Sequence, residues 1–327
     1  MNLIEDIHKR LAEDISAMNE IIFTHLVAKE YLITLVSNHL LKGKGKRIRP
    51  ILTILTSKMF GYEGVDHIKL ASAVEFIHTA TLLHDDVVDG SELRRFRPTA
   101  NTIWGNKASI LVGDFLFSQS FKLMVSANSL SALNSLSRAS AIIAEGEIAQ
   151  LAKLNQKRII NIIEYEQIVT AKTAELLGAA CEVGAIIAGE DENTCQKLRK
   201  FGIELGKIFQ VVDDLLDYTS KDGNTGKNIG DDFLEGKVTI PLIILQQKLA
   251  QQDRVKIEDM ISNETRSSSD LEWVINQINS YNVVQEVKEY VALLKVRAVE
   301  ALSTELPENE FKQYLISMVN YVIERSC

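Results

Sequence analysis

Apolar residues recur at three- and four-residue spacing along nearly the whole chain, which is the pattern of amphipathic helices. In IRPILTILTSKMF, for example, Ile51, Ile54 and Leu55 fall on one face, and Pro50 suits the first helical turn. Only four prolines occur in 327 residues, so long intervals contain nothing that breaks a helix. Strand-like alternation bounded by turn residues is hard to find. The pattern predicts an all-α protein.

The chain shows no division into two regimes of composition. Segments rich in Gly, Ser or charge predict turns at 42–46, 60–64, 90–98, 188–194, 220–232 and 262–270. No linker rich in Pro, Gly or Ser separates them, and no repeat has a solenoid period. With 46% hydrophobic residues, the chain can bury a large core. We therefore expect a single domain over residues 1–327.

The overall charge excludes some functions and indicates a compartment. A formal net charge of −8 argues against a nucleic-acid binder with a basic face, so any bound anion must meet local basic clusters. The three cysteines, Cys181, Cys195 and Cys327, are odd in number and lack metal-ligand spacing. The N-terminus carries acids where a signal peptide needs a basic region. The longest apolar stretch, LLGAACEVGAIIAG, is shorter than the roughly 20 residues that span a bilayer. We expect a soluble, cytoplasmic protein.

Two acidic motifs repeat one pattern, HDDVVD at 84–89 and VDDLLD at 212–217. Because positions i and i+4 share a helix face, Asp85 lies beside Asp89, and Asp213 lies beside Asp217. Like charges at this spacing repel, so something positive must offset them. Carboxylates without nearby His or Cys ligands suit Mg²⁺, whose shell substrate phosphates complete. The motifs predict a phosphorylated ligand.

Solvated, salt-bridged helix faces are the alternative explanation for these acids. Both motifs are embedded in Val, Leu and Phe, which is unlike a solvated face. Calcium binding of the EF-hand type is excluded, because neither motif has the central glycine or the twelfth-position Glu of that loop.

A basic segment, KGKGKRIRP at 42–50, places five Lys or Arg within eight residues. Its two glycines let the backbone approach a ligand, and it precedes a helix N-terminus at Pro50 that favours an anion. This chemistry indicates a diphosphate site; a solvated basic loop and a contact with anionic lipid are the alternatives. It is not a Walker loop, because GxxxxGK[ST] is absent.

Further polar residues lie near the two motifs. Arg94 and Arg95 follow Asp89 closely, and arginine side chains bind phosphate oxygens bidentately. His78 lies two helical turns before Asp85 on the acid stripe, although a lone His is more often a core residue. Individually weaker candidates for binding a leaving diphosphate are Lys172, Thr173, Gln210, Lys227 and Lys237.

Taken together, these residues resemble those of trans-type polyprenyl (isoprenyl) diphosphate synthases, most of all octaprenyl diphosphate synthases, over nearly the whole chain. The matching segments, in the family's order and spacing, are GKGKRIRP, EFIHTATLLHDDVVDGSELRR, the Gly113–Asp114 pair of LVGDFLFSQ, AKTA, FQVVDDLLDY and GKVTIPL. The resemblance implies a single large helical bundle with a central cavity, the isoprenoid synthase fold. It also implies a homodimer, for which the long apolar stretch 120–143 is a candidate interface.

The resemblance assigns roles to individual residues. It implies about three Mg²⁺ ions, with the metal ligands Asp85, Asp89 and Asp213, supported by Asp86, Asp214 and Asp217. It implies that isopentenyl diphosphate is held by Lys46, Arg49, His78 and Arg95. It implies that the allylic diphosphate is held by Arg94, Lys172, Thr173, Gln210 and Lys227, with Lys237 as a further cation.

The implied reaction is electrophilic prenyl transfer without a covalent nucleophile. Cations stabilise the departing diphosphate, isopentenyl diphosphate attacks the allylic carbocation, and a proton is lost. The small Ala80 and Thr81 before the first motif imply an open tunnel and an octaprenyl-class product, made from farnesyl diphosphate for the side chain of ubiquinone or menaquinone. The product implies transient membrane contact on release, without stable insertion.

Two positions depart from the family pattern. Phe96 stands where the family usually has Gly, and the chain ends in Cys327 where we expect a basic residue. Three alternatives remain open: a shorter-chain (geranylgeranyl) synthase, a class I terpene cyclase, and the partner subunit of a heteromeric prenyl synthase. The basic segment argues against a cyclase, and two intact acidic motifs argue against a partner subunit.

Overall fold

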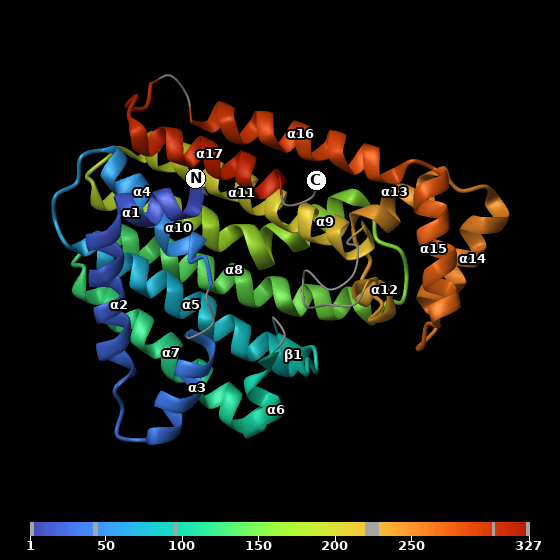
Figure 1. Cartoon of the computed structure of the whole chain (residues 1–327), viewed down its shortest axis with the longest axis horizontal. Helices are drawn as coiled ribbons and strands as arrows, with labels where there is room; N and C mark the ends of the chain where they lie inside the picture. The colour runs from blue at the N-terminus through green and yellow to red at the C-terminus, as the bar shows by residue number, and fades with distance from the viewer. Residues whose placement is uncertain (1–2, 42–44, 95–96, 220–228, 303–304, 325–327) are drawn as a thin grey trace. The chain divides into compact units, whose positions relative to one another are not determined.

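The regular structure of the chain is almost entirely helical (Figure 1). The computed structural model describes residues 3–41, 45–94, 97–219, 229–302 and 305–324. Within these ranges the only strands are β1 (Leu93–Arg94) and β2 (Arg97–Pro98), which form a two-residue antiparallel ladder. The all-α prediction is confirmed, and the short ladder lies in the predicted turn at 90–98.

The chain divides into two compact units. Unit 1 comprises Met1–Ser140, Leu176–Gly202 and Ala301–Met318, and unit 2 comprises Ala141–Glu175, Ile203–Glu300 and Val319–Cys327. The boundaries fall inside the helices α8 (Leu130–Leu154), α11 (Glu192–Thr219) and α17 (Glu310–Glu324). The expectation of one domain over 1–327 stays a prediction.

Unit 1 is built around one central helix, α5 (Asp66–Val88). Fourteen of its 23 residues are buried, so its apolar residues are spread around the helix. Helices packed against it are α2 (Ala12–Leu26), α4 (Ile48–Met59), α6 (Ala100–Trp104) and α7 (Asn106–Ser126). The unit also contains α1 (Leu3–Arg10), α3 (Tyr31–Leu41) and nearly all of α10 (Glu175–Ile187). The first acidic motif lies where α5 ends.

Helix α7 is the one described helix that is long and apolar enough to cross a membrane. The corresponding window is 44% buried, and α7 packs along α5 inside unit 1. A core helix of a folded protein meets the same criteria of length and composition, and the packing against α5 accounts for the buried part of its apolar residues.

Unit 2 holds the second acidic motif on the later part of α11. Its other elements are α9 (Ile162–Val169), the π-helix η1 (Thr170–Ala174), α12 (Asp231–Leu234), α13 (Ile240–Lys248), α14 (Gln251–Ser262), α15 (Ser268–Ser280) and α16 (Val283–Ala301) up to residue 300. Helix α9 begins with a capping box, in which the Asn161 side chain accepts from the Glu164 backbone and Glu164 accepts from the Asn161 backbone. Helix α13 packs on both α9 and α15.

Two of the three cysteines lie in unit 1 as free, buried thiols. Cys181 and Cys195 are 0% and 2% exposed. Burial raises the pKa of the Cys181 thiol far above its ordinary value, and burial with nearby carboxylates raises that of Cys195 to about 12. Both are therefore un-ionised packing residues, as their lack of metal spacing indicated. Cys327 lies outside the described residues.

Candidate active site

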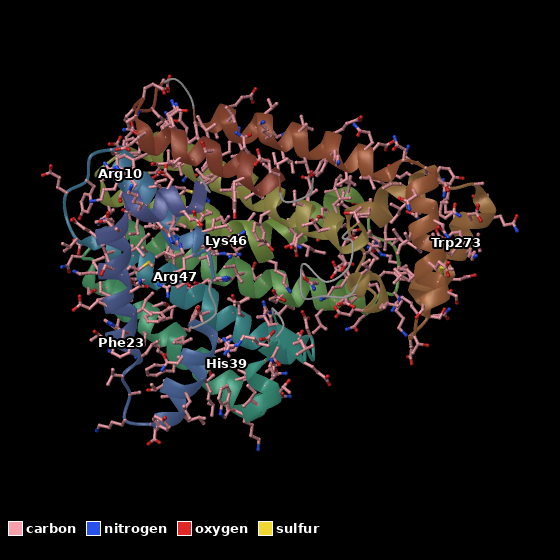
Figure 2. All side chains as sticks on the ribbon, viewed as in Figure 1. Arg10, Phe23, His39, Lys46, Arg47 and Trp273 are labelled. Atoms are coloured by element: carbon pink, nitrogen blue, oxygen red, sulfur yellow. The ribbon has the colours of Figure 1, made fainter. Side chains whose placement is uncertain are left out.

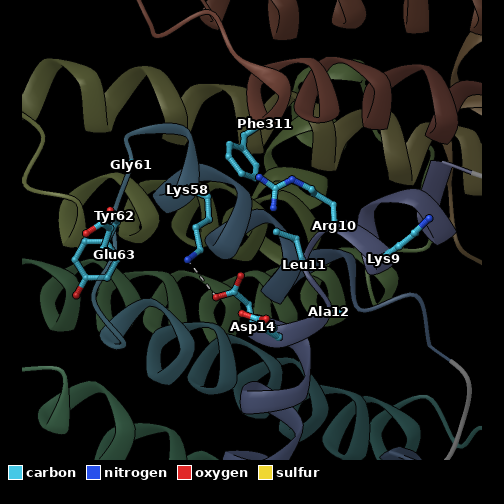
Figure 3. A pocket seen from close by; sticks show the side chains of 11 residues that line it. Lys9, Arg10, Leu11, Ala12, Asp14, Lys58, Gly61, Tyr62, Glu63 and Phe311 are labelled. Atoms are coloured by element: carbon cyan, nitrogen blue, oxygen red, sulfur yellow. Dashed lines mark ion pairs between the residues drawn. The ribbon is translucent and has the colours of Figure 1, made fainter.

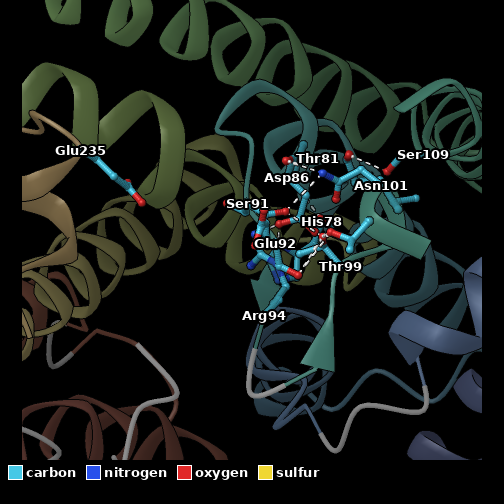
Figure 4. A network of polar contacts seen from close by, with 12 residues as sticks. His78, Thr81, Asp86, Ser91, Glu92, Arg94, Thr99, Asn101, Ser109 and Glu235 are labelled. Carbon is cyan, nitrogen blue, oxygen red and sulfur yellow. Dashed lines mark hydrogen bonds and ion pairs between the residues drawn. The ribbon is translucent and has the colours of Figure 1, made fainter. Parts of the chain in front are cut away.

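The first acidic motif occupies the end of α5, where the helix leaves the core of unit 1. Asp85 is half-buried and Asp89 is exposed at the C-cap, whereas Asp86 is 0% exposed. Arg94 Nε and Nη2 donate to Asp86 Oδ1 over 3.0 and 2.8 Å, as Figure 4 shows. The ion pair compensates the buried charge. Asp86, the inner acid of the motif, is thus a structural anchor, whereas the outer acids Asp85 and Asp89 are less buried.

A set of hydrogen bonds fixes the turn that brings Arg94 back to α5 (Figure 4). Asn101 Nδ2 donates to the carbonyl oxygens of Asp86 and Ser91, each over 3.2 Å. Thr99 Oγ1 donates to the same Ser91 carbonyl over 2.7 Å. These bonds satisfy backbone groups at the end of α5 that have no partner within the helix.

The prediction for the two adjacent arginines is only partly tested. Arg94 was predicted to hold the allylic diphosphate, and its contact with Asp86 uses Nε and Nη2. The Arg94 side chain is 35% exposed, which leaves it accessible to an anion. Its role in binding the allylic diphosphate stays a prediction. Arg95 and Phe96 lie outside the described residues.

Two of the four predicted partners of isopentenyl diphosphate, Arg49 on α4 and His78 on α5, lie in contact. Arg49 Nη1 lies 3.1 Å from His78 Nε2, and Thr81 Oγ1 donates to the His78 carbonyl over 2.8 Å. Arginine has only donors, so Nε2 accepts and the imidazole carries its proton on Nδ1. Lys46 is exposed just before α4, next to the N-cap Arg47 (Figure 2). His78 therefore lies beside the cationic Arg49, with which the family resemblance groups it.

The structure explains the Gly113–Asp114 pair, to which the sequence analysis gave no role. His84 Nε2 lies 3.2 Å from the Ile110 carbonyl and 3.4 Å from Asp114 Oδ1. A Cβ atom at Gly113 would lie 2.3 Å from the same nitrogen. The pair thus lets α7 pack closely against the first motif on α5.

The predicted chain-length residues lie one turn before Asp85. Ala80 is buried, and the half-buried Thr81 uses its hydroxyl within the helix. The much larger Phe76 lies one turn further back and is fully buried. The role of Ala80 and Thr81 in product length stays a prediction.

The second acidic motif repeats the division between inner and outer acids. Asp214 is 2% exposed, whereas Asp213 and Asp217 are half-buried. Tyr165 OH donates to Asp214 Oδ2 over 2.6 Å, and Gln210 Nε2 donates to Asp214 Oδ1 over 2.7 Å. Again, the inner acid anchors the helix to its neighbours.

The network continues to two residues predicted to hold the allylic diphosphate. Thr173 Oγ1 donates to Gln210 Oε1 over 2.9 Å, so the predicted Thr173 and Gln210 are in direct contact. Tyr165 was not among the predicted site residues, and the sequence pattern offers no signal for it.

The electrostatics around Asp214 differ from those around Asp86. Burial, and then the charge of Asp232, raise the pKa of Asp214, while Tyr165 and Gln210 act in the opposite direction. Burial and the Asp214 charge raise the pKa of Tyr165 well above its ordinary value, so its hydroxyl remains a donor. Asp217 Oδ2 accepts from the Asp232 backbone over 3.2 Å.

Lys172 and Thr173 lie on a π-helix, which nothing in the sequence pattern predicted. Its wider turn occupies Thr170–Ala174, and such turns often lie at functional sites. Lys172 Nζ donates to Glu147 Oε2 over 2.9 Å, a partner that the sequence analysis also missed. Two glycines allow this packing, since a Cβ at Gly146 or Gly206 would lie within 2.7 Å of an η1 residue.

The remaining predicted lysines are less informative. Lys237 is half-buried and pairs with Glu235 at 2.8 Å. Lys227 lies outside the described residues.

A cavity of about 500 Å³ lies elsewhere in unit 1, between α1, α2, α4 and α17 (Figure 3). Its lining includes three cations and three acids, and Lys58 pairs with Asp14 at 3.4 Å. The balanced charge does not suit a diphosphate, and none of the predicted site residues lines it.

The acids form no ready-made metal cage. Among the described residues, no group of three or more His, Cys, Asp or Glu side chains is placed to hold a metal ion. This fits Mg²⁺, which proteins commonly bind through one or two carboxylates with substrate phosphates and water.

Comparison with known proteins identifies the family of the chain. The family model for polyprenyl synthetase matches residues 30–278. The chain is 39% identical over 322 residues to a Rhodobacter capsulatus all-trans-nonaprenyl-diphosphate synthase (geranyl-diphosphate specific), covering 98% of both chains. It is 38% identical over 329 residues to the octaprenyl diphosphate synthase of Escherichia coli, covering 99% of both.

A solved structure supports the fold. The polyprenyl synthase of Caulobacter crescentus, complexed with calcium and isoprenyl diphosphate, superposes with a TM-score of 0.92 at 38% identity. The match covers 99% of this chain and 98% of that one, so the predicted isoprenoid synthase fold is confirmed. With the family model matching most of its length, this chain belongs to the polyprenyl synthetase family.

Proposed function

We propose that the protein is a Mg²⁺-dependent, long-chain trans-polyprenyl diphosphate synthase that adds isopentenyl diphosphate repeatedly to farnesyl diphosphate. The observation that carries the proposal is the shared design of the two acidic motifs. In each, the inner acid is buried and tethered while the outer acids are less buried. A solvated, salt-bridged face would not bury one acid of each motif in this way.

Residues of unit 1 would bind the diphosphate of isopentenyl diphosphate. Arg49 and His78 already lie 3.1 Å apart, and Lys46 is exposed just before α4. A diphosphate can accept from Arg49 and from the exposed ammonium group, while His78 orients the guanidinium. Arg95 is included in this set by family resemblance.

Residues of unit 2 would hold the allylic diphosphate. Lys172 and Thr173 project from the π-helix, and Gln210 lies against Thr173. Lys172 is paired with Glu147, so we propose that it exchanges this carboxylate for a diphosphate oxygen. Arg94, Lys227 and Lys237 complete the set by family resemblance.

The outer acids would hold the metal. Asp85, Asp89 and Asp213 are the proposed ligands, and they offer hard carboxylate oxygens. The second oxygen of Asp86 is buried without a hydrogen-bond partner among the described residues, which fits a cation beside this motif. When bound, Mg²⁺ supplies positive charge that stabilises the departing diphosphate.

The residues of the chain bind, orient and screen charge, while the substrates supply the reacting groups. The allylic C–O bond breaks with its electron pair on the diphosphate, and the double bond of isopentenyl diphosphate forms the new C–C bond. A proton then leaves the resulting cation, and the departed diphosphate can accept it. Cationic side chains such as Lys172 act by stabilising the charge that develops on the leaving group.

The decisive experiment is a product assay. The purified protein is incubated with farnesyl diphosphate, isopentenyl diphosphate and Mg²⁺, and the dephosphorylated products are separated by chain length. We expect mainly octaprenyl products and no turnover when a chelator removes Mg²⁺. A cyclic hydrocarbon formed without isopentenyl diphosphate would identify a cyclase, and turnover only with a second protein would identify a partner subunit.

Product length within this class is the finer part of the proposal. The relatives described above make octaprenyl or nonaprenyl chains, and the small Ala80 on α5 is compatible with both. Replacing it in Ala80→Phe should shorten the product, because a ring would then occupy the proposed route of the hydrocarbon. Thr81→Ser, which removes only a methyl group, is the matched control. An unchanged product pattern in Ala80→Phe would remove Ala80 from length control.

We also propose a cytoplasmic homodimer that contacts membranes only transiently. Phe121, Val125 and Leu130 expose 39%, 61% and 81% of their surface within the predicted interface at 120–143. Such a run of exposed apolar residues favours burial against a second copy. Analytical ultracentrifugation should give twice the chain mass, and Val125→Asp with Leu130→Asp should shift it towards the monomer.

A further inference from the structure

We propose that Tyr165 is a positioning residue for the allylic diphosphate. Through its hydrogen bond to the buried Asp214, it keeps Gln210 oriented towards the ligand. This inference rests on the proposed function of the second acidic motif, but it concerns a residue on α9 that none of the matching segments contains.

Tyr165, Asp214, Gln210 and Thr173 form a chain of hydrogen bonds in which each bond has a defined donor and acceptor. Tyr165 OH donates to Asp214 Oδ2, and Gln210 Nε2 donates to Asp214 Oδ1, over 2.6 and 2.7 Å. Thr173 Oγ1 donates to Gln210 Oε1 over 2.9 Å. With its oxygen accepting from Thr173 and its nitrogen donating to Asp214, the Gln210 amide has a defined orientation.

This orientation of the Gln210 amide leaves one of its two N–H groups to donate to a ligand. The amide nitrogen carries two N–H groups, and Asp214 takes only one of them. The other can donate to an anion such as a diphosphate oxygen. Tyr165 protects this arrangement, because it satisfies the second oxygen of Asp214, which is 2% exposed.

Removing the Tyr165 hydroxyl would leave Asp214 Oδ2 without the hydrogen bond that it accepts from this group. A buried oxygen of Asp214 without a hydrogen-bond partner is unfavourable, and Gln210 is the remaining side chain that is hydrogen-bonded to Asp214. We expect its amide to turn so that both N–H groups serve Asp214. The allylic diphosphate then loses a donor, and Thr173 loses the acceptor that orients it.

The test compares Tyr165→Phe with Tyr290→Phe. Tyr290 OH donates to Glu166, so the control removes the same kind of hydroxyl–carboxylate bond from unit 2 without touching the proposed machinery. Tyr165→Phe should raise the KM for farnesyl diphosphate about tenfold and leave the KM for isopentenyl diphosphate within about twofold. A merely structural role would not separate the two substrates. Equal behaviour of the two variants would overturn the inference.

A binding measurement makes the result independent of turnover. Titration calorimetry of inorganic diphosphate with Mg²⁺ should show about tenfold weaker binding to Tyr165→Phe than to Tyr290→Phe or to the unchanged protein. If the unchanged protein elongates nothing yet this difference appears, the proposed function fails and the inference stands. If the protein elongates and no difference appears, the inference fails alone.

If Tyr165→Phe does not fold, Asp214→Asn provides a second test of the same proposal. It should show the same selective rise in the KM for farnesyl diphosphate, since Tyr165 is proposed to act through this carboxylate. Where both variants fold, adding Tyr165→Phe to Asp214→Asn should change that KM by less than about twofold, because the two effects are coupled. An unchanged KM in Asp214→Asn, or fully additive effects, would contradict the inference.

Discussion

The two acidic motifs share one sequence pattern and one division of labour, but they neutralise the inner acid differently. In the first motif, Asp86 is held by a cation, with two nitrogens of Arg94 within 3.0 Å. In the second, Asp214 is held by the neutral donors Tyr165 and Gln210, and the nearby charge of Asp232 opposes its ionisation. The same DDxxD spacing is therefore compatible with two electrostatic environments.

The difference indicates what each anchor does. An arginine fixes Asp86 with a strong, directional ion pair that ties α5 to its own following turn. A tyrosine and a glutamine fix Asp214 less strongly but connect three elements, α9, η1 and α11, on which predicted ligands lie. We infer that the first anchor mainly stabilises the motif, whereas the second also orients substrate-binding side chains.

The largest effect should come from the outer acids, for which the two motifs are expected to be equivalent. Asp85→Ala and Asp213→Ala should each lower kcat on the order of 100- to 1,000-fold, because each removes a ligand for the charge on the leaving group. Steady-state assays over a range of Mg²⁺ would measure this, with circular dichroism to check folding. The exposed acids Glu5 and Asp259 supply matched controls, one in each unit. Near-normal turnover in either variant would remove that acid from the metal site.

The next largest effect should be on stability, and it tests whether the inner acid Asp86 depends on its ion pair with Arg94. Arg94→Met leaves the charge of Asp86 buried without its cation and should cost about 3 kcal/mol of unfolding free energy, measured by urea denaturation. Arg97→Met in the same two-residue ladder is the control, since Arg97 is exposed and contacts only the His39 carbonyl at 3.4 Å among its described contacts. Adding Asp86→Asn to Arg94→Met should recover much of the loss. Equal losses in Arg94→Met and Arg97→Met would show that Asp86 does not depend on the ion pair.

How far the sequence predicted this site depends on the kind of signal. The i, i+4 spacing of the acids placed Asp85 beside Asp89, and the same periodicity placed His78 on the acid stripe. Periodicity could not pair His78 with Arg49 on another helix, and only the family resemblance grouped these two residues. The spacing did not reveal that Asp86 and Asp214 are buried, since their partners Arg94 and Tyr165 depend on a turn and on packing between helices. The π-helix at Thr170–Ala174 also escaped, because nothing in AKTA differs from an ordinary helix. Likewise, the need for a glycine at position 206 is visible only in the structure, where Ala174 packs closely against it.

A smaller effect should distinguish the helix packing behind the two motifs. Gly206→Ala would place a Cβ 2.4 Å from Ala174 Cα, a backbone atom of the π-helix that cannot move alone. Gly113→Ala would meet only the end of the His84 side chain, which can rotate away. We expect losses of about 2 kcal/mol for Gly206→Ala and less than about 1 kcal/mol for Gly113→Ala in denaturant unfolding. Similar losses would mean that the π-helix accommodates the methyl group.

The smallest effect should follow a fall in pH, which we expect to weaken the tether of Asp214 in the second motif before that of Asp86 in the first. Glu164 lies in the first turn of α9, next to Tyr165, and hydrogen bonds from Arg158, then Lys153 and the Asn161 backbone, hold the pKa of its carboxyl well below the ordinary 4.5. A carboxyl with a depressed folded pKa stabilises the native state above its ordinary value, and this contribution is lost as the pH falls below about 4.5 towards the folded pKa. Helix α9 should therefore loosen on acidification, and Tyr165 with it.

Hydrogen exchange on the metal-free protein would show this loosening. Between pH 5 and pH 3, and after correction for intrinsic rates, amides of α9 should lose protection relative to those of α5. Glu164→Gln keeps the geometry of the capping box but not the charge, so its α9 should be less protected at pH 5 and should lose little more at pH 3. If α9 and α5 lose protection together in the unchanged protein, acid acts on the fold as a whole. The two motifs would then differ in the charge of their anchors but not in the stability of the helices that carry them.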